Sequence, residues 1–355
     1  MNQVLTAGII PSQEYALDNN NPIKIMAQAV LAGRTEPFSK EEVATIVDWR
    51  HFSFEPLVPI TTGEEEILKA DIVEDTMCRL NEGASREFFQ LECYLIPDIN
   101  EPQGAHLYSA SAIKNKHWLR QHSKNTSRPM TTEEKIIFLS NPQNLRVKWT
   151  HGNTTQPLAS MGYRSISEYG MFGSNEEFTK IISRIQKDIG RNQLHVLDLG
   201  GGIATALHEA KSLHPELITY NVTRDEEYSC YDVDFQIICF LERMPLGLQG
   251  KIDFIFSNMA TRYIVFCDLV VYGCVEVLAT GGEMDVFFAS ESSHNPDLED
   301  VKRRMKRAYE YLKDLESSKL IQLSIDSNFT SNIGGSFEAE KSSLYPASRV
   351  RVVKL

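Results

Sequence analysis

Residues 194–204 read LHVLDLGGGIA, and this stretch decides the fold because an apolar strand runs directly into a glycine cluster and then into a helix. Val196, Leu197 and Leu199 have the aliphatic character of a strand that is buried on both faces. Residues 204–211 have the composition of the first turns of a helix. The order of strand, glycine turn and helix is typical of a nucleotide-binding turn.

The glycines of this turn allow backbone to contact a ligand. Gly200 and Gly202 have no Cβ, so they can adopt positive φ and let a nucleoside lie against the main chain. Asp198, at the carboxyl end of the strand, can accept a hydrogen bond from the ligand directly or through water. A tight turn without a ligand is the alternative interpretation of the same glycines.

The run DLGGGIA at 198–204 resembles motif I of the class I S-adenosylmethionine-dependent methyltransferases, an acidic residue followed by alternating glycines. Ala204 replaces the last glycine of that pattern. A dinucleotide-binding protein usually has G-x-G-x-x-G and an acidic residue at the end of the next strand, and neither is present. The resemblance implies that Asp198, Gly200, Gly201 and Gly202 bind S-adenosyl-L-methionine and its product S-adenosyl-L-homocysteine.

Strands and helices alternate beyond the glycines in the order of that family, and the resemblance covers about residues 160–355. The pattern predicts an α/β fold: a doubly wound, mostly parallel, seven-stranded (Rossmann-like) sheet, with a smaller α+β N-terminal domain. The expected strands are 194–199, 217–222, 235–240, 252–258, 283–288, 320–325 and 349–353, with helices at 267–278 and 302–315 and a turn at 280–282.

Two positions depart from the family's cofactor site. Asn221 ends the second strand, where the family has an acidic residue that binds the ribose hydroxyls, and an amide is a weaker acceptor than a carboxylate. On this basis Asn221→Asp is expected to tighten cofactor binding by about 1 kcal/mol. Phe240, Leu241 and Glu242 occupy the neighbourhood of the family's adenine-binding aspartate. A non-catalytic methyltransferase fold therefore stays open as an alternative.

The sequence offers candidate catalytic residues but no fixed triad, because methyl transfer from a sulfonium depends on positioning. The family resemblance implies that Asn258, just after the fourth strand, lies beside the transferred methyl group, and Tyr263 and His294 are expected in loops at the carboxyl edge of the sheet. Tyr169 is a candidate to contact the cationic sulfur with its ring. Plain packing at a domain interface is the alternative role for Tyr169.

Charge and composition bear on the partners. The chain has 355 residues, 42% of them hydrophobic, which fits two domains. Its net charge of −12 makes a nucleic-acid acceptor unlikely and favours a small-molecule or protein methyl acceptor. The basic run at 302–307 is interpreted as a solvated helix face, with a phosphate-binding patch as the alternative.

Cysteine spacing and hydropathy predict the compartment. The six cysteines show no C-x-x-C pair and no histidine at zinc spacing, so no metal site is expected. No signal peptide and no membrane span of ~18 apolar residues is recognised. These features predict a soluble, cytoplasmic protein in a reducing compartment.

The N-terminal part is expected to divide into a helical segment at 1–55 and an accessory domain at 56–150, before the methyltransferase-like domain at 151–355. Ser39 is expected to cap a helix over 40–49, with Val43, Ile46 and Val47 on one face.

Apolar and proline fragments between residues 56 and 140 weakly resemble a U-box, the zinc-free relative of RING fingers in ubiquitin ligases. This resemblance implies that Ile60, Trp118 and Pro129 form a groove for a ubiquitin-conjugating enzyme. The second hypothesis is therefore an interaction protein resembling a ubiquitin ligase, in which the methyltransferase fold is not catalytic. The alternative for this region is an accessory or recognition domain with Trp118 in its core.

Overall fold

The computed structural model describes residues 9–10, 22–47, 49–82, 88–97, 105–117, 120–121, 128–139, 148–152, 154–157, 165–202, 204–224, 233–257, 264–289, 297–326 and 347–355. The chain divides into two compact units. The first unit comprises the described parts of Met1–Tyr15, Trp49–Leu68 and Gly162–Leu355. The second comprises the described parts of Ala16–Asp48 and Lys69–Met161.

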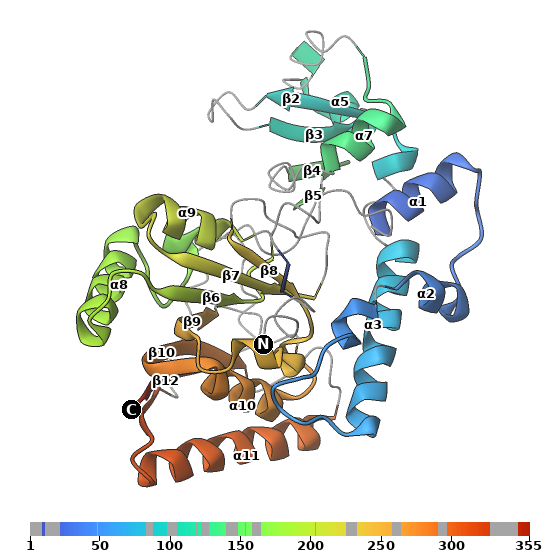
Figure 1. Ribbon diagram of the computed structural model, residues 1–355. Helices are drawn as coiled ribbons and strands as arrows, with labels where there is room; N and C mark the ends of the chain where they lie inside the picture. The colour runs from blue at the N-terminus through green and yellow to red at the C-terminus, as the bar shows by residue number, and fades with distance from the viewer. Residues whose placement is uncertain are drawn as a thin grey trace. The chain divides into compact units, whose positions relative to one another are not determined.

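One eight-stranded sheet forms the centre of the first unit, with the order β1-β8-β7-β6-β9-β10-β12-β11 (Figure 1). The strands are β1 (Ile9–Ile10), β6 (His195–Leu199), β7 (Ile218–Thr223), β8 (Phe235–Ile238), β9 (Ile252–Ser257), β10 (Leu278–Ala289), β11 (Ile321–Asp326) and β12 (Ala347–Lys354). All seven strands expected from the sequence are present, and the two-residue β1 is added at one edge.

The sheet is mixed, which corrects the expectation of a mostly parallel sheet at its two margins. The five neighbouring strands β8-β7-β6-β9-β10 pair in parallel. By contrast, β1 pairs antiparallel with β8, and β12 pairs antiparallel with both β10 and β11. The turn expected at 280–282 is also different. β10 runs through it with a register shift between Leu278 and Glu283, where Gly281 has a φ of +80°. Glycine marks a bulge in a strand as well as a turn.

Helices cover both faces of the sheet, as a doubly wound fold requires (Figure 1). α8 (Asn175–Ile189) and α9 (Thr205–Leu213) pack on one face, against Val196 and Phe254. α10 (Cys267–Val277) and α11 (Leu298–Ser317) pack on the other, against Leu197 and Ile255. Successive residues of β6 and β9 thus alternate between two cores, as the period of a strand dictates.

Residues 49–57, which we call the strap, belong to the first unit although they precede β6, the first of its parallel strands, by more than 100 residues. The strap contains the short helix η2 (Trp49–Phe52), and the long helix α3 (Thr62–Glu82) begins soon after it. The units therefore divide the chain differently from the segments 1–55, 56–150 and 151–355. Local patterning cannot show this division, because the strap is held by contacts that are distant in sequence.

The second unit contains helices and a four-stranded sheet of order β2-β3-β4-β5. Ser39 caps its helix α2 in a capping box with Glu42, as the sequence predicts, and Val43 and Val47 are buried. The elements are α1 (Pro22–Leu31), α2 (Lys40–Ile46), the later turns of α3, β2 (Cys93–Pro97), β3 (Ala105–Ser109), α5 (Ala110–Asn115), α7 (Thr132–Leu139), β4 (Lys148–His151) and β5 (Thr154–Pro157).

Candidate functional site

The candidate site lies where the order of the parallel strands reverses. The chain passes from β6 to β7 and β8 on one side, then returns to place β9 and β10 on the other side of β6. In open α/β sheets, ligands bind beyond the carboxyl ends of the strands at such a switch point. The glycine turn follows β6 directly, so the structure brings the motif to this position.

The glycine turn has the backbone conformation that the sequence predicts. Gly200 and Gly202 have φ of +70° and +56°, and Ala204, at the start of α9, has φ of +61°. The Gly200 N–H donates to the Val222 carbonyl over 2.8 Å, which ties the turn to β7. Positive φ is costly for most residues, so glycine is required at the two earlier positions.

Asp198 lies fully buried at the carboxyl end of β6. The Tyr169 hydroxyl donates to its Oδ2 over 2.7 Å, whereas Oδ1 has no hydrogen-bond partner among the described residues. Burial raises the pKa of Asp198 to about 7, and the hydrogen bond from Tyr169 opposes this rise. The carboxyl group can therefore exist in either protonation state near neutral pH, and its Oδ1 is a buried acceptor whose hydrogen-bonding capacity is unused among the described residues.

Gly201 fills the space between two polar side chains. A Cβ on Gly201 would lie 2.5 Å from Asn221 Oδ1 and 2.6 Å from Asp198 Oδ2. No real Cβ tolerates such contacts, so a side chain here would displace both residues. Close packing therefore requires glycine at position 201, whereas positive φ favours glycine at positions 200 and 202.

Asn221, in register with Asp198 across β6 and β7, is buried beneath the turn. Its Nδ2 donates to the Gly202 carbonyl over 2.8 Å and to Gln236 Oε1 over 3.0 Å. Asn221 Oδ1 and Gln236 Nε2 lack hydrogen-bond partners among the described residues. Gln236 is a site residue that the sequence reasoning missed, although a glutamine in the apolar strand FQII was a signal of a buried polar role.

Tyr169 packs within the core rather than presenting its ring to open space. It is buried, stacks with Phe172 at 6.0 Å between centroids, and meets Phe256 edge-on at 5.4 Å. Together with its hydrogen bond to Asp198, this arrangement favours the packing role that the sequence left open. Contact between Tyr169 and the cationic sulfur stays a prediction.

Phe240 and Leu241 follow β8 at the same edge of the sheet. Phe240 is 4% exposed, and Leu241 begins the short helix η6 (Leu241–Arg243). Both side chains are buried, and so is the neighbouring Glu242, whose Oε1 accepts hydrogen bonds from the N–H groups of Val265 and Phe266. Contact of Phe240 and Leu241 with the cofactor remains a prediction.

Several predicted residues lie outside the described residues or apart from one another. Asn258, Tyr263, His294 and Trp118 are outside the described residues. Ile60 and Pro129 are both half-buried, but Ile60 belongs to the first unit and Pro129 to the second. The structure thus gives no support to a single domain that holds all three residues of the expected U-box groove.

The basic run on α11 is neutralised by carboxylates. Arg304 is 8% exposed, and its guanidinium donates to Asp268 over 3.0 Å and to Glu64 over 3.0 Å. Burial opposes ionisation of Arg304, but its bonds to Asp268 raise its pKa. Carboxylates lie within salt-bridge distance of each cation in the run, in the pairs Lys302–Glu299, Arg303–Asp300, Arg304–Asp268, Lys306–Glu310 and Arg307–Asp268.

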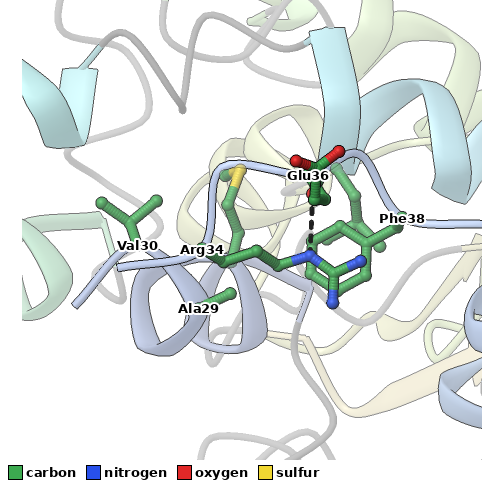
Figure 2. Close-up of a pocket in the computed structure, with 7 residues that line it drawn as sticks. Ala29, Val30, Arg34, Glu36 and Phe38 are labelled. Atoms are coloured by element: carbon green, nitrogen blue, oxygen red, sulfur yellow. Dashed lines mark hydrogen bonds between the residues drawn. The ribbon is translucent and has the colours of Figure 1, made fainter. Parts of the chain in front are cut away.

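Other features of the described residues carry no comparable site. A hollow in the second unit, beside Arg34 and Phe38, has a volume of about 10 Å³ (Figure 2), whereas pockets for small molecules measure about 300–1,000 Å³. Within the described ranges no group of side chains suits a metal ion, and five cysteines there are free. No helix among them is long and apolar enough to cross a membrane.

No protein-family model and no curated protein sequence matches this chain. Solved structures that resemble it include the aminoglycoside resistance methyltransferase NpmB1, with 14% identity and a TM-score of 0.30 over 51% of this chain and 94% of that one. The 16S rRNA (adenine(1408)-N(1))-methyltransferase from Catenulisporales acidiphilia has 14% identity and a TM-score of 0.30 over 50% and 93%. The antibiotic-resistance methyltransferase Kmr has 10% identity and a TM-score of 0.31 over 49% and 93%.

Proposed function

We propose that the first unit binds S-adenosyl-L-methionine and transfers its methyl group to a small-molecule or protein acceptor. The observation that carries the proposal is the position of the motif DLGGGIA, whose glycine turn lies at the switch point of the sheet with positive φ at Gly200 and Gly202. This is the position and conformation that a nucleoside needs to approach the main chain.

The buried polar atoms beneath the turn fit this cofactor. Asp198 Oδ1 and Asn221 Oδ1 are acceptors without partners, and Gln236 Nε2 is a donor without one among the described residues. A buried polar group without a hydrogen bond costs about 1–3 kcal/mol, so these atoms favour a ligand rich in hydroxyl groups and nitrogens. Asp198 and Asn221 would hold hydroxyl groups of the nucleoside, and Gly200 and Gly202 would let it lie against the backbone.

The acceptor and the catalytic residues are part of the proposal. When bound, the cofactor supplies an activated methyl group, so the protein's main task is to orient the acceptor. Asn258, Tyr263 and His294 follow the strands whose ends form the switch point, and we propose them for that task. The pairing of every cation at 302–307 with a carboxylate supports an acceptor other than nucleic acid.

Calorimetric titration with S-adenosyl-L-homocysteine tests the proposal. The wild type should bind it, and Gly200→Val should abolish binding because a β-branched residue resists positive φ and fills the space against the ligand. Gly190→Val is the matched control, since Gly190 also has positive φ, at +75°, and open space around its Cα at the end of α8. Unchanged affinity of Gly200→Val, or no binding by the wild type, would refute the proposed function.

A further inference from the structure

The strap brings aromatic side chains to the carboxyl end of β8. The ring centroid of Phe52 lies 5.6 Å from that of Phe240, and the centroid of His51 lies 5.9 Å from it. Phe240 and His51 are buried, but Phe52 is only half-buried. Phe240 is therefore the buried member of the cluster, and Phe52, whose ring also lies 6.0 Å from that of the more exposed Trp49, is partly accessible.

Arg243 holds the strap in this position. Its Nε donates to the His51 carbonyl over 3.3 Å and its Nη2 to the Phe54 carbonyl over 3.1 Å. The guanidinium carbon also lies 4.8 Å from the ring centroid of Phe52. A ligand at this end of the sheet would meet a preorganised aromatic surface, which lowers the entropy cost of binding.

Backbone pairing fixes the rest of the strap. The Leu57 N–H donates to the Met244 carbonyl over 2.7 Å, and Pro56 and Pro245 form an antiparallel bridge. Phe54 is part of the same apolar core as the sheet. The strap is therefore an integral part of the first unit.

Among the described residues, the end of β8 offers a base few polar side chains, of which the Arg224 guanidinium lies 5.9 Å from the Phe240 ring centroid. Phe240 stands where the family resemblance would place an aspartate, and the nearby Glu242 is engaged elsewhere, since its Oε1 accepts from the N–H groups of Val265 and Phe266. Stacking on an aromatic ring contributes about 1–3 kcal/mol per base and tolerates different bases, because every base has a π face.

We propose that Phe52 is the stacking surface for the nucleobase of a nucleoside bound at the glycine turn, and that the 6-amino group of the base contributes little to binding. This inference rests on the proposed function for the presence of a nucleoside. β8 lies two strands from β6, a separation of about 10 Å that a nucleoside can span.

Calorimetry with two ligands and matched variants tests the surface. Phe52→Ala should weaken the binding of S-adenosyl-L-homocysteine at least tenfold, and Phe52→Trp should retain it. Tyr311→Ala is the control, because Tyr311 pairs with Tyr272 at 4.6 Å on α10 and α11, away from the strap. The deaminated analogue, S-inosyl-L-homocysteine, should bind the wild type within about threefold of the parent ligand.

Two results would overturn the inference: affinity unchanged by Phe52→Ala, or a loss of more than thirtyfold for the deaminated analogue. If the wild type does not bind S-adenosyl-L-homocysteine at all, the proposed function fails, and adenosine becomes the probe. Trp49, 36% exposed and 6.0 Å from Phe52 between ring centroids, then reports binding by its fluorescence, with Trp49→Phe as the blank. An adenosine signal that Phe52→Ala removes supports the stacking surface, and the absence of any signal overturns it.

Discussion

The two ends of the candidate nucleoside site are built from different interactions. At the end of β6, buried polar atoms of Asp198 and Asn221 lie beneath the glycine turn, some of them without partners. At the end of β8, aromatic rings gather around Phe240, and hydrogen bonds from Arg243 hold the strap in place. The first end depends on hydrogen bonding and protonation, while the second depends on aromatic packing and on the hydrogen bonds of Arg243.

This difference predicts different responses to change. The polar end should respond to pH, because its carboxyl group is buried and incompletely hydrogen-bonded. The aromatic end should respond to truncation and to loss of Arg243, because its contacts join residues about 190 positions apart in the sequence. Variants at each end therefore test whether the two ends differ in this way.

The largest expected effect is the pH dependence that Asp198 imposes on stability. Its pKa rises from 3.8 to about 7 on burial, so the folded state retains a proton that the unfolded state loses above pH 4. Stability should consequently fall as pH rises from 4 to 7, by up to about 4 kcal/mol. Asp198→Asn should remove this component, as measured by urea unfolding at pH 4 and pH 8.

Asp234 supplies a control of opposite sign. Burial opposes its ionisation, but hydrogen bonds from Lys211 and Thr219 lower its pKa overall. Its contribution to stability is therefore present above the unfolded pKa of 3.8 and is lost only as pH falls below it, so Asp234→Asn should destabilise the protein more at pH 8 than at pH 2 to 3. The same pH trend for both variants would contradict the assignment of a raised pKa to Asp198.

The polar end shows how far sequence reasoning reaches. The glycine turn and the seven strands were predictable, because residues 194–204 and the later alternation carry local signals of period and conformation. The hydrogen bonds of Asn221 were not, because they depend on Gln236 in a neighbouring strand. The reversed direction of β12 also leaves no local pattern, since an isolated strand looks the same in either direction.

The next effect concerns Asn221→Asp, for which the structure reverses the expectation of tighter binding. The substitution removes an Nδ2 group that donates to the Gly202 carbonyl and to Gln236 Oε1, and it places a carboxylate among acceptors. The cost should be about 2 kcal/mol in unfolding free energy, with weaker binding of S-adenosyl-L-homocysteine. Thr219→Val, which removes a hydroxyl donor to Asp234 from the same strand but away from the turn, is the control for binding.

If Asn221→Asp instead tightens binding, the added charge must gain more from the nucleoside hydroxyl groups than the turn loses with the Nδ2 donor, and the contrast between the two ends would weaken. Calorimetry and urea unfolding on the same preparations separate this outcome from simple destabilisation.

The strap shows the limit of sequence reasoning. Residues 49–57 lie near the boundary expected at 55, and no periodic pattern links them to β8. Arg243 was visible only as one charge after an apolar strand, and its partners are backbone carbonyls, which any sequence provides. Contacts of this kind can be recognised only in the folded chain.

The smallest expected effect tests which partner of Arg243 holds the strap. Glu65 Oε2 lies 3.5 Å from Nη1, and the side chain of Glu65 is 33% exposed whereas that of Arg243 is 5% exposed, so this half-buried ion pair should contribute about 1 kcal/mol. Glu65→Gln should therefore change the unfolding free energy little and leave Trp49 fluorescence unaltered. Arg243→Met, which also removes both carbonyl bonds, should cost clearly more and shift that fluorescence as the strap loosens. Urea unfolding at low and at high salt measures both losses. Salt should weaken the contribution of the ion pair, which reaches solvent through Glu65, more than that of the buried carbonyl bonds. Equal losses from the two variants would show that the carboxylate, rather than the carbonyls, fixes the strap.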